Sequence, residues 1–163
     1  MGSLSAHTLS PKDKNRILFE SLPASLPEVL VPDDTDHLAV ASAGVARLER
    51  LEEESLGDVV VWRDLCALTE TFRTFYGPER VLSVWRELYE THRPRAFKPV
   101  PGTSEIVRVG KRCSWVQMAY TFECCATPAT LCSGIVALVP AANSQWRIWM
   151  FTTLLEQLKG YPS

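Results

Sequence analysis

The chain has 163 residues, with 17 basic and 19 acidic side chains, 46% hydrophobic residues and 22% charged residues. This length fits one domain, and the apolar fraction excludes an intrinsically disordered chain. The formal net charge of −2 gives no electrostatic case for binding nucleic acid or an anionic membrane. All five tryptophans follow position 61, so the later part of the chain is rich in large aromatic side chains.

The N-terminal segment, residues 1–35, is polar and contains four prolines, which predicts an arm separate from an α+β domain at 36–163. We expect one short helix there, Lys12–Ser21, followed by an extended stretch whose side chains, Leu26 and Leu30 among them, tuck into surface grooves. No signal peptide is predicted, and no run approaches the ~18 apolar residues of a membrane span. The sequence therefore predicts a cytoplasmic protein.

Two helices are predicted in the first part of the domain. Asp36 is a typical helix N-cap, and the apolar residues that follow it recur at helical spacing, so this helix should end near Ser55 or Gly57. Gly77-Pro78 opens a second helix with an apolar stripe that ends at His92. Between them, Asp58–Asp64 is rich in β-branched residues and predicts a strand, whereas 65–76 fits either a short helix or an irregular crossing.

The chain changes character after Pro94, where short turns separate segments that alternate or run apolar. Short loops between long strands predict an antiparallel meander, and helices followed by strands predict an α+β fold. The expected strands are Phe97–Val100, Glu105–Val109, Ser114–Cys124, Thr130–Val139 and Trp146–Leu155.

The last two predicted strands are apolar on both faces, unlike an antiparallel strand with one wet face. Helices can cover only one face in a chain of this size. We therefore expect a homodimer through the outer face of the sheet. Cover by the N-terminal arm alone and a wrong strand assignment are the alternatives.

The five cysteines include no pair at C-x-x-C spacing, and the three histidines are scattered. We expect free thiols that pack as small apolar side chains, and no metal site. A nucleophilic cysteine would need a histidine that only the fold could bring near it.

Two stretches, 58–77 and 146–160, resemble the NTF2-like segment that precedes the flavin and NADP domains of fungal flavin-dependent monooxygenases. The likeness spans roughly residues 22–160 and implies the NTF2-like (SnoaL-like) α+β cone. In that fold, N-terminal helices pack in a strongly curved antiparallel sheet that leaves an apolar pocket. The chain contains no G-x-G-x-x-G fingerprint, so we expect a stand-alone protein with no cofactor.

The resemblance implies a cofactor-independent isomerase or cyclase, possibly a dehydratase, in secondary-metabolite biosynthesis. Its substrate would be a hydrophobic small molecule, an apolar natural-product intermediate, bound in the cone pocket and transformed by acid/base catalysis. The alternatives are a non-catalytic ligand-binding or accessory protein that partners a separate oxygenase, and a purely structural dimerisation module.

Three residues are the candidates for acid/base work in such a pocket. Asp64 could act as base or acid at the end of its strand, or it could cap the following turn or pair with an arginine. Arg73 could hold a carbonyl or enolate oxygen, or its stem could pack on aromatic rings. Tyr120 could donate to an oxyanion, or it could be a core tyrosine with one satisfied hydrogen bond.

The candidates for substrate binding are mostly aromatic, and each could equally be a core or interface residue. Glu123 is expected to be a solvated rim charge, and His92 to cap its helix. The predicted substrate-binding residues are Trp62, Phe72, Phe75, Tyr76, Trp85, Met118, Phe122 and Trp149.

Overall fold

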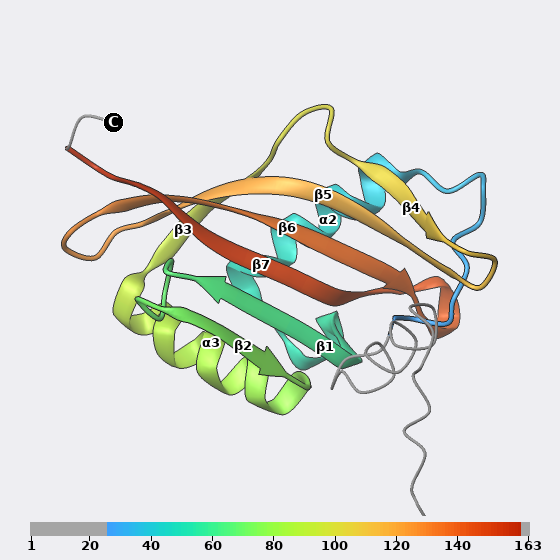
Figure 1. Cartoon of the computed structure of the whole chain (residues 1–163), viewed down its shortest axis with the longest axis horizontal. Coiled ribbons are helices and arrows are strands. Elements are labelled where there is room, and N and C mark those ends of the chain that lie inside the picture. The colour runs from blue at the N-terminus through green and yellow to red at the C-terminus, as the bar shows by residue number, and fades with distance from the viewer. Residues whose placement is uncertain (1–25, 161–163) are drawn as a thin grey trace, which may run out of the picture.

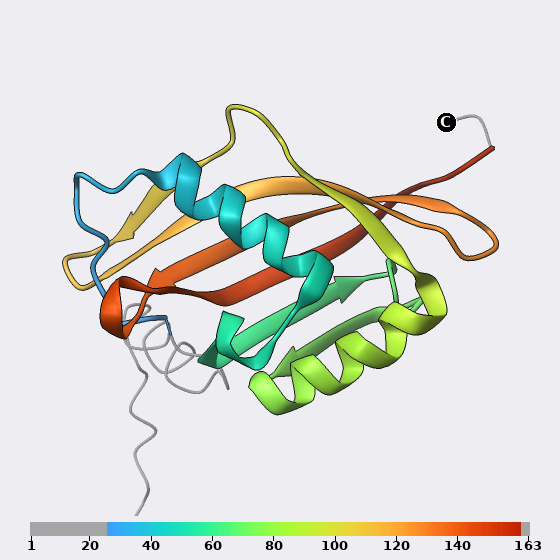
Figure 2. The ribbon, with the colours of Figure 1, turned by 180° about the vertical axis from the view of Figure 1, so that it is seen from behind.

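A seven-stranded sheet wraps along two helices in the computed structural model, which describes residues 26–160 (Figures 1 and 2). The predicted helix Lys12–Ser21 lies outside the described residues. The helices are α2 (His37–Arg47) and α3 (Pro78–His92). The strands are β1 (Leu56–Leu65), β2 (Phe72–Tyr76), β3 (Pro94–Pro99), β4 (Glu105–Val109), β5 (Cys113–Cys124), β6 (Thr130–Pro140) and β7 (Trp146–Leu158).

Helix α2 begins as predicted but ends earlier. The Asp36 side chain accepts a hydrogen bond from the Ala39 backbone N–H, which satisfies one free donor of the first turn. The helix then tightens into a 3₁₀ turn, and Leu51 is extended, with a φ of −72° and a ψ of 125°. Leu48 and Leu51 are both buried, so the apolar spacing that predicted a longer helix is satisfied by a shorter helix and a turn.

The ambiguous stretch 65–76 contains a tight turn and then β2, an edge strand antiparallel to β1. Helix α3 follows with Pro78 at its first position, and it ends at Arg93 in the left-handed conformation. Helix α3 packs on β1 and β2, while α2 packs on β5 and β6, so both helices cover one face of the sheet.

The strand order is β2-β1-β7-β6-β5-β3, and β4 also pairs with β5. All neighbouring pairs are antiparallel except β1 and β7, which are parallel. The prediction of an α+β fold is confirmed, but the prediction of a purely antiparallel sheet is wrong at this one pair. Short loops show that consecutive strands are antiparallel, but they carry no information about β1 and β7, which come from opposite ends of the domain.

Strand β7 breaks the simple alternation expected from its sequence. The register shifts between the pairs Ala137–Met150 and Leu138–Ile148, which leaves Trp149 as an extra residue in β7. Ile148 and Phe151 therefore point toward the helices, whereas Trp149 joins Trp115 in a separate cluster on the other face. The structure thus confirms that β7 buries apolar side chains on both faces.

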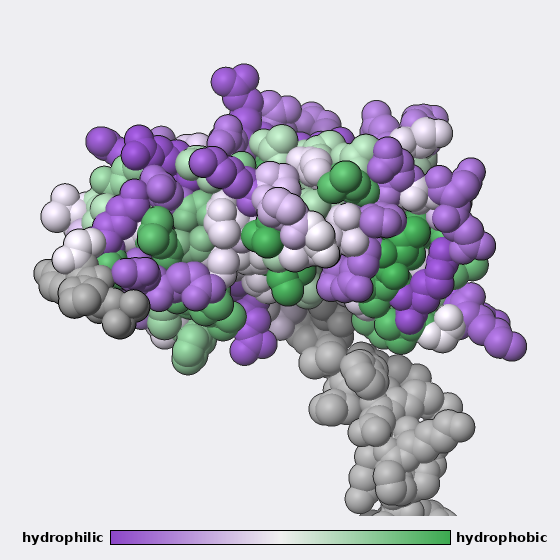
Figure 3. All heavy atoms as spheres, turned by 90° about the horizontal axis from the view of Figure 1, so that it is seen from above, coloured by the Kyte–Doolittle hydropathy of each residue, from purple (hydrophilic) through white to green (hydrophobic). Residues whose placement is uncertain are grey.

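The described part of the predicted arm runs beside the start of β5. Ser114 donates from its backbone N–H to the carbonyl of Val29 and accepts from Val31 N–H through its hydroxyl, at 2.9 and 2.6 Å. Val31 is buried, but Leu26 and Leu30 are exposed. The extended arm is as expected. Of the residues predicted to tuck into the domain, Val29 is half-buried, whereas the fully buried Val31 was not predicted. On the side shown in Figure 3, hydrophilic side chains are interspersed among apolar ones.

Candidate functional site

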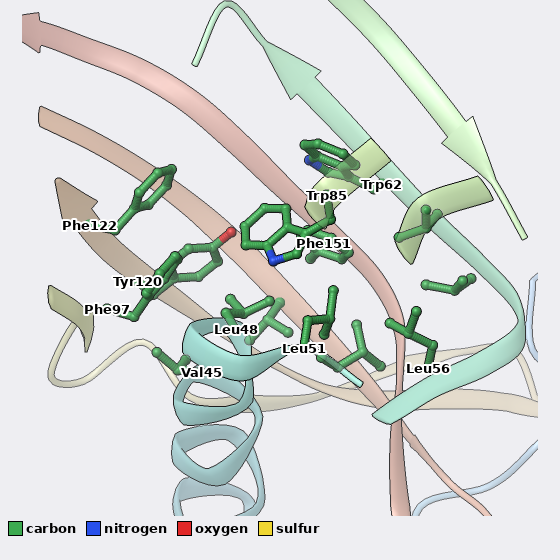
Figure 4. Packing of buried hydrophobic residues seen from close by; sticks show 14 of the residues in the cluster. Val45, Leu48, Leu51, Leu56, Trp62, Trp85, Phe97, Tyr120, Phe122 and Phe151 are labelled. Atoms are coloured by element: carbon green, nitrogen blue, oxygen red, sulfur yellow. The ribbon is translucent and has the colours of Figure 1, made fainter. Parts of the chain in front are cut away.

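Aromatic rings fill the space between the curved sheet and the two helices (Figure 4). The rings of Trp62 and Phe151 stack at 5.6 Å between centroids, and Trp85 meets both of them edge-on. Offset and edge-to-face contacts of this kind stabilise a core beyond the area that they bury. Six of the predicted catalytic and substrate-binding residues lie in this core with at most 3% of their surface exposed: Trp62, Phe75, Trp85, Met118, Tyr120 and Phe122.

The carboxylate of Asp64 is fully buried and accepts hydrogen bonds from the turn that follows β1. The Leu68 N–H contacts both oxygens at 3.1 Å, and Oδ2 also accepts from the backbone N–H and the hydroxyl of Thr69 at 2.7 and 2.6 Å. Charge-assisted bonds to a carboxylate are stronger than neutral ones. Asp64 therefore fixes the shape of the 66–71 turn, as in the capping alternative for this residue.

A buried threonine links Asp64 to the aromatic core. The Thr153 hydroxyl donates to Asp64 Oδ1 at 2.5 Å and accepts from Trp62 Nε1 at 2.9 Å. Sequence reasoning missed both Thr153 and Thr69. Thr153 could have been identified as a small polar residue at an inward position of an otherwise apolar strand. Thr69 could have been identified because it lies in the turn that directly follows Asp64.

Tyr120 is fully buried, and its hydroxyl donates to the backbone carbonyl of Thr152 at 2.5 Å. Burial raises the pKa of this hydroxyl well above its usual value, and the nearby Cys132 and Asp64 add to the shift. Tyr120 is therefore a neutral donor whose proton already has an acceptor within the protein.

The predicted residues of β2 lie apart from this interior, except for Phe75. The Arg73 guanidinium lies over the Phe75 ring, 5.0 Å from its centroid, and the Arg73 side chain is exposed. Tyr76 pairs with Val61 and Phe72 with Leu65, on the face opposite to the pair Trp62–Phe75.

Phe72 and Tyr76 are exposed to solvent, as expected for side chains on the outer face of the sheet. Phe72 is 71% exposed and Tyr76 is 44% exposed. Trp149 belongs to the same outer face, where its ring packs on Trp115 at 5.0 Å between centroids. The structure therefore does not bring Phe72, Tyr76 or Trp149 together with the other predicted substrate-binding residues.

A cavity of about 370 Å³ is lined by residues from the end of α3, the turn after β1, the β5–β6 hairpin and β7. We call it the mouth cavity. The end of β1 and the end of α3 lie on the left of Figure 1. Leu155 and Leu158 of β7 give it apolar walls, and the turn held by Asp64 forms one rim. The lining residues are Cys66, Ala67, Glu70, Thr91, His92, Cys124, Ala126, Thr127, Pro128, Thr130, Leu155 and Leu158.

The fold brings His92 to this cavity beside two cysteines, Cys66 and Cys124. The carbonyl of His92 accepts hydrogen bonds from the backbone N–H groups of Cys125 and Ala126, at 3.2 and 3.3 Å, which ties the β5–β6 hairpin to the end of α3. Glu70 reaches the same cavity from the turn after β1. An imidazole, a carboxylate and two thiols thus share one mainly apolar hollow, which is the usual composition of a small-molecule site.

Glu123 lies at the rim of the sheet, where it pairs with Lys159 at 3.0 Å and with Arg95 at 3.6 Å. The hydrogen bond from Lys159 is the main cause that lowers the pKa of this carboxyl.

Among residues 26–160, no three histidine, cysteine or acidic side chains are grouped where they could hold a metal ion. No helix in the same range is long and apolar enough to cross a membrane.

No protein-family model matches the sequence, and no curated protein sequence matches it either. Solved structures do match. The chain is similar to a ketosteroid isomerase-like protein from Erwinia carotovora atroseptica, with a TM-score of 0.53 and 14% identity over 76% of this chain and 98% of that one. It is similar to LinA with a TM-score of 0.52 and 11% identity, over 78% of this chain and 90% of that one.

A third similar structure is that of Bre5 from yeast, which is associated with the deubiquitinase Ubp3. Its TM-score is 0.52 at 12% identity, over 78% of this chain and 99% of that one. These similarities show an NTF2-like α+β fold, as the sequence resemblance implied. The same fold thus occurs in an isomerase-like protein and in a protein that associates with an enzyme, so fold alone does not choose between those functions.

Proposed function

We propose that this protein binds a small, mainly apolar molecule in the mouth cavity and acts as a non-catalytic binding or accessory protein. The observation that carries the proposal is where the polar groups of the interior are used. The Asp64 carboxylate already accepts hydrogen bonds from Leu68, Thr69 and Thr153. The Tyr120 hydroxyl already donates to the Thr152 carbonyl. The mouth cavity, in contrast, is open and has apolar walls with a few polar groups.

The size of the cavity supports a ligand of modest dimensions. Ligand pockets range from roughly 300 to 1,000 Å³, and about 370 Å³ lies at the lower end of that range. A bicyclic aromatic alcohol such as 2-naphthol has the apolar surface and the single polar group that this lining suits. We take this compound as the probe, because the natural ligand is unidentified.

A cofactor-independent isomerase, cyclase or dehydratase that acts on an apolar natural-product intermediate is the second candidate. It is favoured by the placement of His92 and Glu70, two proton-transfer groups, on the wall of one apolar cavity. In this version Asp64 is a positioning residue, because it holds the turn that carries Glu70. The roles of Asp64, Arg73 and Tyr120 as catalytic residues stay predictions.

One experiment separates the two candidates. Binding of 2-naphthol is measured by calorimetry, and conversion of 3-cyclohexen-1-one to 2-cyclohexen-1-one, a cofactor-free proton transfer, is followed by ultraviolet absorbance. Binding without conversion above the buffer rate supports the accessory function. Conversion that falls to the buffer rate in His92→Gln supports the isomerase, and the absence of both binding and conversion contradicts the whole proposal.

We also propose that the outer face of the sheet packs on a second copy of this chain. This face carries exposed apolar side chains on the edge strand, Phe72 on β2, and on a central strand, Ile135 on β6, and it also carries the Trp115–Trp149 cluster. Ile135 is 40% exposed, and Ala119, its partner in the β5–β6 register, is half-buried. A two-fold axis would place one apolar face against its own copy.

A further inference from the structure

The turn after β1 brings a buried carboxylate close to the mouth cavity. Cys66 of this turn lines the cavity, and the Asp64 carboxylate that holds the turn is fully buried. Its donors are neutral: the backbone N–H groups of Leu68 and Thr69 and the hydroxyls of Thr69 and Thr153. Asp64 forms no ion pair with another described residue, so no cation balances its charge. Because little water screens a buried charge, the charge of Asp64 also acts on a molecule held in the cavity.

Glu70 and the end of α3 add negative charge at the rim of the cavity. The Glu70 side chain lines the cavity, and it forms no ion pair with another described residue. Thr91 and His92, the last two residues of α3, line the cavity as well. The carbonyl groups at the C-terminus of a helix carry roughly half an elementary negative charge, which stabilises a cation placed near them. A ligand group at this rim therefore faces both a carboxylate and a helix C-terminus.

The basic side chains near the cavity do not line it. Arg73 pairs in register with Asp64, but its guanidinium lies over an aromatic ring of β2, 5.0 Å from the ring centroid. Lys159 forms an ion pair with Glu123 at 3.0 Å, and Arg93, which follows α3, is exposed. Among the described residues that line the mouth cavity, none is a lysine or an arginine. A positively charged ligand therefore meets negative groups there without a competing lysine or arginine on the wall.

An apolar body that carries one positive charge fits these surroundings. We propose that the ligand of the mouth cavity is a small apolar amine, bound as its ammonium ion. Its apolar part packs on Leu155 and Leu158, and its ammonium group lies at the rim beside Glu70 and the end of α3. An ammonium ion donates hydrogen bonds, which the Glu70 carboxylate and the neutral form of the His92 imidazole can accept. This inference rests on the proposed binding function of that cavity.

The test compares three ligands of one shape that differ in charge. At neutral pH, 2-(aminomethyl)naphthalene is an ammonium ion, 2-naphthalenemethanol is its neutral counterpart, and 2-naphthoate is an anion. In calorimetry with the full chain, the ammonium ion should bind about fivefold more tightly than the alcohol, and the carboxylate should bind least tightly. Equal affinities for the ammonium ion and the alcohol, or tighter binding of the carboxylate, overturn this inference while the binding function stands. If none of the three ligands binds, the proposed binding function fails as well.

Glu70→Gln tests where the ammonium group lies. This variant keeps the size of the side chain and removes its charge, so the preference for the ammonium ion over the alcohol should fall from about fivefold to about twofold. The remaining preference comes from Asp64 and the end of α3. Glu79→Gln, in the first turn of α3 and outside the cavity lining, is the matched control and should keep the full preference. An unchanged preference in Glu70→Gln, or an equal loss in Glu79→Gln, overturns the position given to the ammonium group.

Discussion

The Tyr120 hydroxyl reaches the carbonyl oxygen of Thr152 through the space that Gly134 leaves open between β6 and β7. At this point the Ile135 N–H bonds to the Thr152 hydroxyl, at 2.9 Å. A phenol from β5 and a threonine side chain thus satisfy groups of the β6 and β7 backbones. The role of Tyr120 in this arrangement is to connect three strands.

Gly134→Ala should destabilise the fold strongly. A Cβ atom at position 134 would overlap the Thr152 carbonyl oxygen and lie 2.6 Å from the Tyr120 hydroxyl oxygen, so the strands must move apart. We expect a loss of about 3 kcal/mol in the free energy of unfolding, the upper end for overpacking, measured by urea denaturation. Gly57→Ala is the matched control in β1, because its Cβ would lie at an ordinary 3.4 Å from the Ile148 carbonyl oxygen. Equal stability of the two variants would contradict the role given to Gly134.

Asp64→Asn tests whether this carboxylate holds the turn. The amide nitrogen cannot accept the hydrogen bonds that Thr69 and Leu68 donate, so at least one buried donor loses its acceptor. We expect a loss of about 2–4 kcal/mol in the free energy of unfolding. Asp58→Asn, in the exposed part of β1, should change stability by less than about 0.5 kcal/mol. An unchanged unfolding midpoint in Asp64→Asn would contradict this role in the turn.

Ala126→Trp should close the mouth cavity. Ala126 lies on its wall in the β5–β6 hairpin, where a large ring has room to turn into the hollow. We expect the affinity for 2-naphthol to fall by about tenfold or more in calorimetry, because the ring takes the volume that the ligand needs. The control is Ala142→Trp, an exposed position in the turn before β7, which should bind as the unmodified protein does. Unchanged binding in Ala126→Trp would place the ligand elsewhere.

Ile135→Glu should separate the proposed homodimer. The side chain lies on the outer face of β6, where a buried carboxylate in an apolar interface would be costly. Sedimentation at micromolar concentration should give a dimer for the unmodified chain and a monomer for this variant. Leu38→Glu, an exposed position on α2, should remain dimeric. A monomeric unmodified chain would refute the interface.

Local sequence signals predicted most of the elements. Asp36 and Pro78 mark where the two helices begin, and short turns delimit the strands after Pro94. These features depend on neighbours in the chain, which is why they could be identified without a structure. The parallel pairing of β1 with β7 and the extra residue at Trp149 depend on segments far apart in sequence, and neither leaves a local mark.

The sequence also identified many of the interior residues but not their use, and it placed Phe72, Tyr76 and Trp149 there wrongly. Its apolar and aromatic residues determined an α+β domain with a core rich in tryptophan, because burial follows from composition and period. Only the tertiary structure decided that the Asp64 carboxylate is taken up by a turn and that Tyr120 bonds to a backbone carbonyl. It also decided that His92, Glu70 and Cys124 line one cavity. The reason is physical: what a polar side chain can do depends on which partners reach it, and those partners come from strands and turns distant in the chain.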